Sequence, residues 1–355
     1  MMTPDDLRAA VAAGIVTEAQ AVNLKVLSDS RRGARENLAA GDEPFELFKG
    51  FNEVFIVVGL GILALGWAGV AGLFVELGGG DPLAKTVGVA IVGALILWGL
   101  SEYFVRRRRM VAPAIALSIL FAGNAAVGMS AQFAQPFMLA QQDFTSLPMP
   151  FTLATLALFG YWWRFRVPFA LAMIALGLFA TALVFAADMA GSPGSVSDLF
   201  LLSAGGPFAW ITLALGVAVF VVAMVFDMSD PHRVTRRSAN GFWMHVVAAP
   251  ALVNTLALSL LAQGQSGLLL AFLALIAVVA IVIDRRSFLI AGVGYSVTLS
   301  ATVFDHQGSV YTVLALGVFL LLLGAFWERI RAELLRMMPF LPLNRLPPSF
   351  VRTHD

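Results

Sequence analysis

The sequence predicts an all-α polytopic membrane protein, a bundle of about ten transmembrane helices with both termini in the cytoplasm. Three observations support this prediction. The 355 residues are 59% hydrophobic and only 13% charged, whereas soluble domains are roughly 45–50% apolar and about 25% charged. Apolar stretches long enough to cross a bilayer recur along the chain. Lysine and arginine are concentrated in every second connection between those stretches.

Residues 1–50 are expected to form a cytoplasmic helical hairpin followed by an interfacial helix. The first helix should begin near Pro4 and end near Gly14, because proline suits a first turn and glycine a C-terminal stop. Thr17 and Gln20 have the spacing of a capping box, which predicts a second helix. The region has too few large apolar groups to bury a core. We therefore interpret the hairpin as a docking site for a protein partner.

The two ends of the membrane domain carry amphipathic segments. In Glu43–Phe55, the aromatic residues Phe45, Phe48 and Phe51 recur every three positions. They would share one face of a short helix that lies in the membrane interface. Residues 328–355 are predicted to form a basic juxtamembrane helix and a proline-rich tail. Anionic lipid headgroups at the cytoplasmic face would attract this tail. The alternative is that its arginines only set the topology.

The transmembrane domain is expected to occupy residues 51–327. A crossing helix needs about 20 mostly apolar residues, and ten stretches have or approach this length. They lie near residues 54–75, 83–104, 110–131, 149–164, 167–187, 205–226, 241–262, 266–283, 287–304 and 310–327. The fourth, eighth, ninth and tenth stretches are the shortest.

The distribution of charge predicts the orientation of these spans. Basic residues stay on the cytoplasmic side of a membrane. With ten spans, 22 of the 23 lysines and arginines fall on one face, which has a net charge of +6, while the other face has a net charge of −5. The basic connections contain Arg31, Arg32, Arg35, Lys49, Arg106, Arg107, Arg108, Arg109, Arg164, Arg166, Arg233, Arg236, Arg237, Arg285, Arg286, Arg329, Arg331, Arg336, Arg345 and Arg352. This alternation places both termini in the cytoplasm.

Several segments together resemble a family of uncharacterised bacterial inner-membrane proteins, which is known only as a domain of unknown function. The segments are GIVTEAQA, DEPFELFKGFNEVF, NGFWMHVVAAPALVN, DRRSFLIAGVGYSV and AFWERIRAELLRMMPFLPLNRLPP. Members of that family have a short helical cytoplasmic N-terminus and a multi-helix membrane body. The resemblance implies a location in the bacterial inner membrane. It implies no activity, substrate or catalytic residue.

The sequence contains none of the motifs that would identify an enzyme, a metal site or a nucleic-acid-binding protein. The absence of cysteine excludes disulfides, thiolate metal sites and cysteine nucleophiles. The four histidines are far apart in the sequence, and neither an HExxH pair nor a GxSxG elbow is present. We therefore expect no metal, cofactor or nucleic-acid partner. The missing motifs count against an enzyme.

A proton relay at the cytoplasmic boundary is one hypothesis for a functional site. Glu53 begins the first span, Glu102 ends the second, and His245 lies just inside the seventh. A carboxylate beside an imidazole raises the pKa of the histidine, so the three residues could pass a proton. The alternative is that each side chain reaches out to headgroups or water on its own.

The seventh span also contains a proline and an amide. Pro250 is predicted to kink the helix, because it leaves the carbonyl of residue 246 without its usual donor. At about 100° per residue, His245 and Asn254 would face opposite ways on a straight helix. The three residues are therefore not expected to form one site.

A second set of polar residues lies at a more outward depth. These residues either line a polar path or form hydrogen bonds between helices, which contribute about 0.6–2 kcal/mol each. The set comprises Asn124, Gln132, Asn254, Tyr295, Thr298 and Thr302.

The leading functional hypothesis is a secondary transporter or permease for a small solute. Ten spans with cytoplasmic ends resemble the drug/metabolite carriers, which contain two inverted five-span repeats. However, the two halves of this chain are not similar, and no acidic residue lies at mid-membrane, where coupled carriers usually place one. The alternative is a non-catalytic scaffold, assembly factor or sensor that docks partners through its cytoplasmic ends. A membrane-embedded enzyme or lipid-handling protein is the third class.

Overall fold

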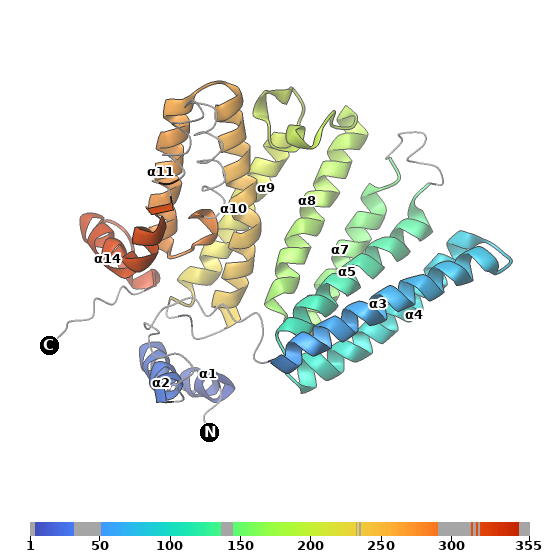
Figure 1. Cartoon of the computed structure of the whole chain (residues 1–355), viewed down its shortest axis with the longest axis horizontal. Helices are drawn as coiled ribbons and strands as arrows, with labels where there is room; N and C mark the ends of the chain where they lie inside the picture. The colour runs from blue at the N-terminus through green and yellow to red at the C-terminus, as the bar shows by residue number, and fades with distance from the viewer. Residues whose placement is uncertain are drawn as a thin grey trace. The chain divides into compact units, whose positions relative to one another are not determined.

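The computed structural model describes residues 4–31, 51–135, 145–231, 233, 236–289, 314, 317–318 and 320–347. Within these ranges the regular secondary structure is helical and contains no strand, which confirms the all-α class. The chain divides into two compact units (Figure 1). We call them the α3–α8 unit, residues 45–199 and 205–212, and the α9–α14 unit, residues 1–44, 200–204 and 213–355.

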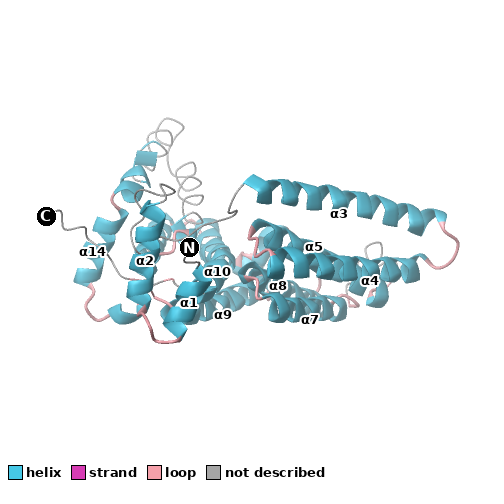
Figure 2. Ribbon diagram, turned by 90° about the horizontal axis from the view of Figure 1, so that it is seen from below, coloured by secondary structure: helices cyan, strands magenta, loops and turns pink. Residues whose placement is uncertain are grey.

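The α3–α8 unit consists of long antiparallel helices, which Figure 2 shows in a second view. Short connections join α3 to α4 and α7 to α8. The elements are α3 (Phe51–Leu77), α4 (Pro82–Ser101), the π-helical turn η1 (Glu102–Arg107), α5 (Ala112–Phe133), α7 (Pro148–Phe165), α8 (Pro168–Ala190) and the 3₁₀ turn η2 (Val196–Leu199). Proline opens four of these helices, where the missing N–H costs no intrahelical hydrogen bond.

The α9–α14 unit combines apolar helices with shorter amphipathic ones. The elements are α1 (Pro4–Ala12), α2 (Glu18–Arg31), the 3₁₀ turn η3 (Leu202–Ala204), α9 (Phe208–Met228, counted here from residue 213), α10 (Arg236–Ala262), α11 (Ser266–Ile283), α14 (Trp327–Met337) and the 3₁₀ turn η4 (Leu343–Arg345). The predicted capping box is confirmed. The backbone N–H of Thr17 donates to Gln20 Oε1 at 2.9 Å, and that of Gln20 donates to Thr17 Oγ1 at 3.3 Å.

Seven helices of the described residues are long and apolar enough to cross a membrane: α3, α4 with η1, α5, α8, α9, α10 and α11. They coincide with seven of the ten expected spans. Helix α7 covers the fourth expected span but is not among the seven, because Pro148, Pro150, two tryptophans and Arg164 shorten its apolar run. The expected span 287–304 lies largely outside the described residues, and the expected span 310–327 lies partly outside them. The total of ten and the sides of the termini therefore stay predictions.

The surface of α3 shows what surrounds these helices. Of its 27 residues, only Glu53 and Leu60 are buried, although residues 54–75 of this helix are apolar throughout. Apolar surface on this scale is unfavourable in water and is stable when lipid covers it. Together with the other six apolar helices, it identifies the chain as an integral membrane protein that crosses the bilayer several times.

An aromatic cluster holds the α3–α8 unit together at one end. Trp98 of α4, Phe121 of α5, and Tyr161 and Phe165 of α7 pack with ring centroids 4.6–6.2 Å apart. The hydroxyl groups of Tyr161 and Ser101 are 2.9 Å apart, which satisfies the buried phenol. This end of the unit is fixed by packing between three helices.

Candidate functional site

The strongest concentration of buried charge lies in the α9–α14 unit, where three chain segments meet. Asp227 is in the last turn of α9, His245 is on α10, and Arg285 follows the end of α11. Asp227 Oδ2 is 2.9 Å from His245 Nε2 and accepts a hydrogen bond of 2.9 Å from Arg285 Nε. Arg285 Nη2 donates to the other carboxylate oxygen at 2.5 Å. We call these three residues the Asp227 cluster.

The Asp227 cluster is shielded from solvent by aromatic rings. His245 is 0% exposed and lies edge-on to Phe220 and Phe288, with ring centroids 5.5 and 5.7 Å away. The Arg285 guanidinium lies 5.9 Å from the ring centroid of Phe242. Charges in such surroundings are stable only when they are paired. The two-bond contact between guanidinium and carboxylate provides that pairing, and the imidazole shares the same carboxylate.

Gly241 allows α10 to come close to this carboxylate. A Cβ atom at this position would overlap Asp227 Oδ1 and would lie 3.0 Å from Asp227 Cγ. Arg285 Nη2 also donates to the carbonyl oxygen of Ser238 at 3.1 Å, one turn earlier on the same helix. Helix α10 therefore contributes to the site in two ways: Gly241 leaves room for the carboxylate, and the Ser238 carbonyl oxygen accepts a hydrogen bond from Arg285.

A second buried network begins at the neighbouring residue, Asp284. Arg233 Nη1 is 2.9 Å from Asp284 Oδ2, and Trp327 Nε1 of α14 donates to Asp284 Oδ1 at 2.7 Å. Asp284 has a left-handed backbone with φ 56° at the end of α11, a conformation that aspartate tolerates better than most residues. Consecutive residues thus serve two networks, because Asp284 binds α14 and Arg285 binds α9.

Arg331 fixes α14 to the end of α11. Its side chain is 1% exposed and donates to the carbonyl oxygens of Ile281, Val282 and Pro347. Carbonyls at a helix C-terminus lack intrahelical donors, so the guanidinium replaces those donors. Burial lowers the pKa of Arg331, and the nearby charge of Asp284 raises it. An arginine pKa starts so high that the side chain stays protonated.

The N-terminal hairpin lies beside the connection between α9 and α10. Burial lowers the pKa of Arg8 on α1, while the charge of Asp230 raises it. Asp230 also accepts a hydrogen bond of 3.3 Å from the backbone N–H of Ser238 at the start of α10. The hairpin, which the sequence assigns to a protein partner, thus has an interaction within its own chain.

The three residues of the expected relay have partners in their own units. Glu53 accepts hydrogen bonds of 3.2 and 3.0 Å from the backbone N–H groups of Val111 and Ala112, at the start of α5. Glu102 is 3.0 Å from Arg106 and 2.7 Å from Arg164. Glu53 and Glu102 belong to the α3–α8 unit, and His245 belongs to the other. His245 contacts a carboxylate, as expected, but this carboxylate is Asp227. The relay of all three stays a prediction.

The outward polar set divides in a similar way. Asn124 Nδ2 donates to the Ala90 carbonyl oxygen at 2.8 Å and so joins α5 to α4. Gln132 is exposed near the end of α5, and Asn254 is half-buried on α10. Tyr295, Thr298 and Thr302 lie outside the described residues. Within the described part, the hydrogen bond of Asn124 is of the kind expected for contact between helices.

Helix α10 continues through Pro250 as one α-helix from Arg236 to Ala262. The expected kink stays a prediction. In the described part of the chain, no three side chains of histidine, aspartate or glutamate lie close enough together to hold a metal ion.

Sequence reasoning missed most of the Asp227 cluster, although a signal was present. Asp227 directly follows the sixth expected span and Arg285 follows the eighth, so both lie at the same predicted boundary as His245. The arginines of these connections were interpreted as topology signals, but the structure buries Arg233, Arg285 and Arg331. A comparison of predicted depth across all the spans would have selected Asp227 and Arg285 as candidates.

Comparisons with known proteins leave the function to be inferred from this geometry. No family model, no curated protein and no solved structure matches the chain. The resemblance to uncharacterised bacterial inner-membrane proteins therefore stays a prediction.

Proposed function

We propose that this membrane protein is a secondary transporter or permease for a small solute, and that protonation of His245 is coupled to solute movement. The observation that supports the proposal is the buried Asp227 cluster. Ionisable residues inside a membrane domain are costly, and they usually belong to ion or proton pathways. Histidine is also the side chain whose ordinary pKa is closest to physiological pH.

The mechanism we propose uses the two competing donors around Asp227. When the imidazole is neutral, Arg285 provides the positive charge that the buried carboxylate requires. When His245 takes up a proton, it can supply that charge in place of Arg285. The guanidinium is then free to exchange Asp227 for another acceptor, such as an anionic solute or a backbone carbonyl. Such an exchange of partners would connect proton uptake to a rearrangement of α9, α10 and the end of α11.

The remaining parts of the proposal concern location and partners. We place the protein in the bacterial inner membrane, as the resemblance implies. The alternation of basic connections supports the placement of both termini in the cytoplasm. Its partners would be a small solute, anionic lipid headgroups at the cytoplasmic face, and a protein bound by the N-terminal hairpin. The charge sorting and the basic C-terminal segment support the assignment of anionic headgroups.

The first test identifies a ligand. Thermal unfolding of the detergent-solubilised protein is measured against a panel of metabolites and ions at two pH values. A ligand at 100 times its dissociation constant stabilises the folded state by about 2.7 kcal/mol. The protein is then reconstituted in vesicles that contain a pH indicator, and each ligand found in the first step is added outside. Transport coupled to protons predicts a change of internal pH that depends on the solute.

A matched pair of variants makes this test specific. His245→Gln removes the titratable ring and should abolish the solute-dependent pH change, whereas His354→Gln, near the end of the sequence, should retain it. Full coupling in the His245→Gln protein would contradict the proposed role of His245. Failure to find any ligand that stabilises the wild-type protein would favour the alternative function.

The alternative is a non-catalytic scaffold, assembly factor or sensor. One observation favours it: both carboxylate oxygens of Asp227 are already engaged by His245 and Arg285, so the cluster is complete without a solute. If the protein is a scaffold, His245→Gln should change only its stability. It also predicts that partner capture requires the N-terminal hairpin, and deletion of residues 1–31 tests that requirement.

A further inference from the structure

The C-terminal helix α14 has three distinct sectors around its circumference. The first sector faces the protein and contains Trp327, Arg331, Ala332 and Leu335. The second is polar and exposed, with Arg329, Glu333 and Arg336 at spacings of four and three. The third is apolar and contains Ile330, Leu334 and Met337, again at spacings of four and three. Residues at such spacings lie on one side of a helix, so each sector is a continuous row.

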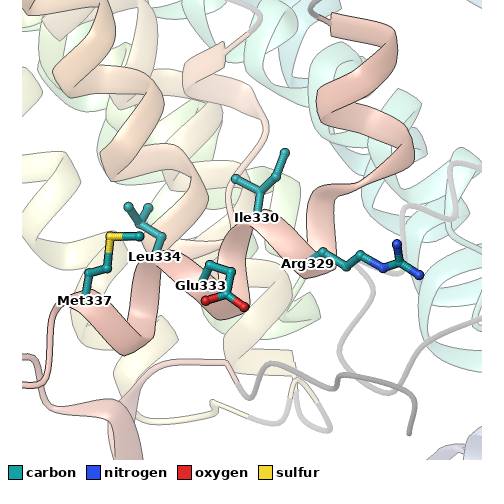
Figure 3. Close-up of a pocket in the computed structure, with 5 residues that line it drawn as sticks. All are labelled: Arg329, Ile330, Glu333, Leu334 and Met337. Carbon is teal, nitrogen blue, oxygen red and sulfur yellow. The ribbon is translucent and has the colours of Figure 1, made fainter. Parts of the chain in front are cut away.

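The described part of the chain covers the apolar row only in part: Leu334 packs against the protein, whereas Ile330 is 37% exposed. Met337 is 72% exposed, and Phe340 in the following turn is 79% exposed. Figure 3 shows Ile330, Leu334 and Met337 on the same helix as Arg329 and Glu333. Together these five residues line an open groove of about 350 Å³. Large exposed apolar side chains at the edge of a polar row mark a surface that is covered in the working protein.

The position of α14 indicates what covers this surface. Arg331 and Trp327 hold α14 at the C-terminal end of α11, one of the helices that can cross the membrane (Figure 1). Since a crossing helix ends near the bilayer boundary, α14 lies at that depth. The helical residues 320–325, which directly precede α14, also expose apolar side chains, among them Leu321 and Leu322. The apolar row thus continues a surface of the kind that lipid covers.

The exposed charge of the segment favours one class of lipid. Arg329, Arg336 and Arg345 are exposed, and Glu333, 2.6 Å from Arg336, neutralises part of this charge. An amphipathic helix with arginines on its polar side and large apolar residues beside them binds in the plane of an anionic membrane surface.

We propose that α14 and the turn after it form a membrane-surface element, in which Ile330, Met337 and Phe340 insert among the lipids while Arg329 and Arg336 bind anionic headgroups. Arg331 and Trp327 fix this element to the end of α11. This inference rests on the part of the proposed function that assigns anionic headgroups as a partner. It does not depend on transport, and it applies equally to a scaffold.

The absence of cysteine makes a direct test possible, because each variant carries only the cysteine introduced into it. Spin labels are attached at Met337→Cys, Phe340→Cys and Arg336→Cys of the full chain in nanodiscs that contain anionic lipid. Accessibility to oxygen, which concentrates in lipid, is compared with accessibility to a water-soluble nickel complex. Leu321→Cys serves as the lipid reference and Ile15→Cys, exposed between α1 and α2, as the aqueous reference.

The expected result is a high oxygen-to-nickel ratio at residues 337 and 340, close to that at Leu321, and a several-fold lower ratio at residue 336. A ratio at residue 337 equal to that at Ile15 would show that the row is in water and overturn the proposal. Low accessibility to both reagents would show that protein covers the row, either a second copy or another partner, and would also overturn it.

The role of anionic lipid is tested with the same label at residue 337. Replacing the anionic lipid by a zwitterionic one should raise its accessibility to nickel. The double substitution Arg329→Gln and Arg336→Gln should have the same effect in anionic nanodiscs. Unchanged accessibility in both experiments would overturn the assignment of anionic headgroups. All the substituted side chains are exposed, so each variant is expected to fold. The elution volume and the thermal unfolding of each labelled protein check this expectation.

Discussion

Single residues in the α9–α14 unit carry charge where the surroundings are apolar. Asp227 contacts the imidazole of His245 and the guanidinium of Arg285, while Asp284 pairs with Arg233 and accepts a hydrogen bond from the indole of Trp327. Removal of one member of such a network leaves a buried charge without its counter-ion, which costs more than the intact network contributes. Stability should therefore depend strongly on these residues, and weakly on exposed charges beside them in the sequence.

Arg285 provides the sharpest test of this asymmetry. Arg285→Ala leaves the Asp227 carboxylate buried without its guanidinium, and we expect a loss of roughly 3–5 kcal/mol in the free energy of unfolding. The neighbouring Arg286 is exposed and lies 5.3 Å from the ring centroid of Trp327, so Arg286→Ala should cost about 1 kcal/mol or less. Thermal unfolding in detergent measures both. Equal losses in the two variants would contradict the burial of Arg285.

Gly241 tests the close approach of α10 to α9. In Gly241→Ala the new methyl group would overlap the Asp227 carboxylate, so we expect a loss of stability and a weakened pairing with His245. The same substitution at Gly59 of α3 meets no atom within 4 Å. There it should be neutral or stabilise by roughly 0.5–1 kcal/mol, because alanine favours a helix interior more than glycine does. A stabilised Gly241→Ala protein would show that α10 does not approach Asp227 so closely.

At the scale of elements, charged side chains complete two helix ends. The Glu53 carboxylate accepts from the N–H groups that begin α5, and the Arg331 guanidinium donates to the carbonyls that end α11. Each charge has the sign that the helix dipole favours at that end. Both contacts join elements that are distant in the sequence, so they fix packing as well as a helix end.

The contribution of Glu53 to the start of α5 can be tested by substitution. Glu53→Gln retains an acceptor but loses the charge, so we expect a loss of about 1–2 kcal/mol, at the upper end of the range for a partly buried charge at a helix terminus. Glu76, exposed near the other end of α3, serves as the control, and Glu76→Gln should leave the unfolding temperature unchanged. If the two variants unfold at the same temperature, the carboxylate of Glu53 does not stabilise the start of α5.

At the scale of the whole molecule, the prediction concerns topology. A chain without cysteine allows single introduced cysteines to be labelled in intact bacterial cells by a membrane-impermeant maleimide. Exposed positions in two alternate connections, Ser197→Cys and Gln263→Cys, should react from outside. Arg107→Cys, in a basic connection, should react only after the membrane is opened, because basic residues stay in the cytoplasm. Labelling of residue 107 in intact cells would contradict the proposed orientation.

The sequence predicted much of the fold because the relevant information is local. The apolar runs that became α3, α4, α5 and α8–α11 have the length and composition that lipid requires, and no contact between helices is needed to recognise them. The hairpin was predicted for the same reason, since Thr17 and Gln20 are three residues apart. Helix α7 gave a weaker signal, because its polar ends shorten the apolar run.

The candidate site could be predicted only in part. Depth along a helix follows from counting residues, so His245 was placed near other ionisable groups at one boundary. Which groups touch depends on how the helices rotate and pack against each other, and a sequence does not state this. The pairing of His245 with Asp227, and of that carboxylate with Arg285, was decided by the tertiary structure. The physical reason is that lipid selects a helix by its own composition, whereas a buried charge is stabilised by neighbours that only the folded chain supplies.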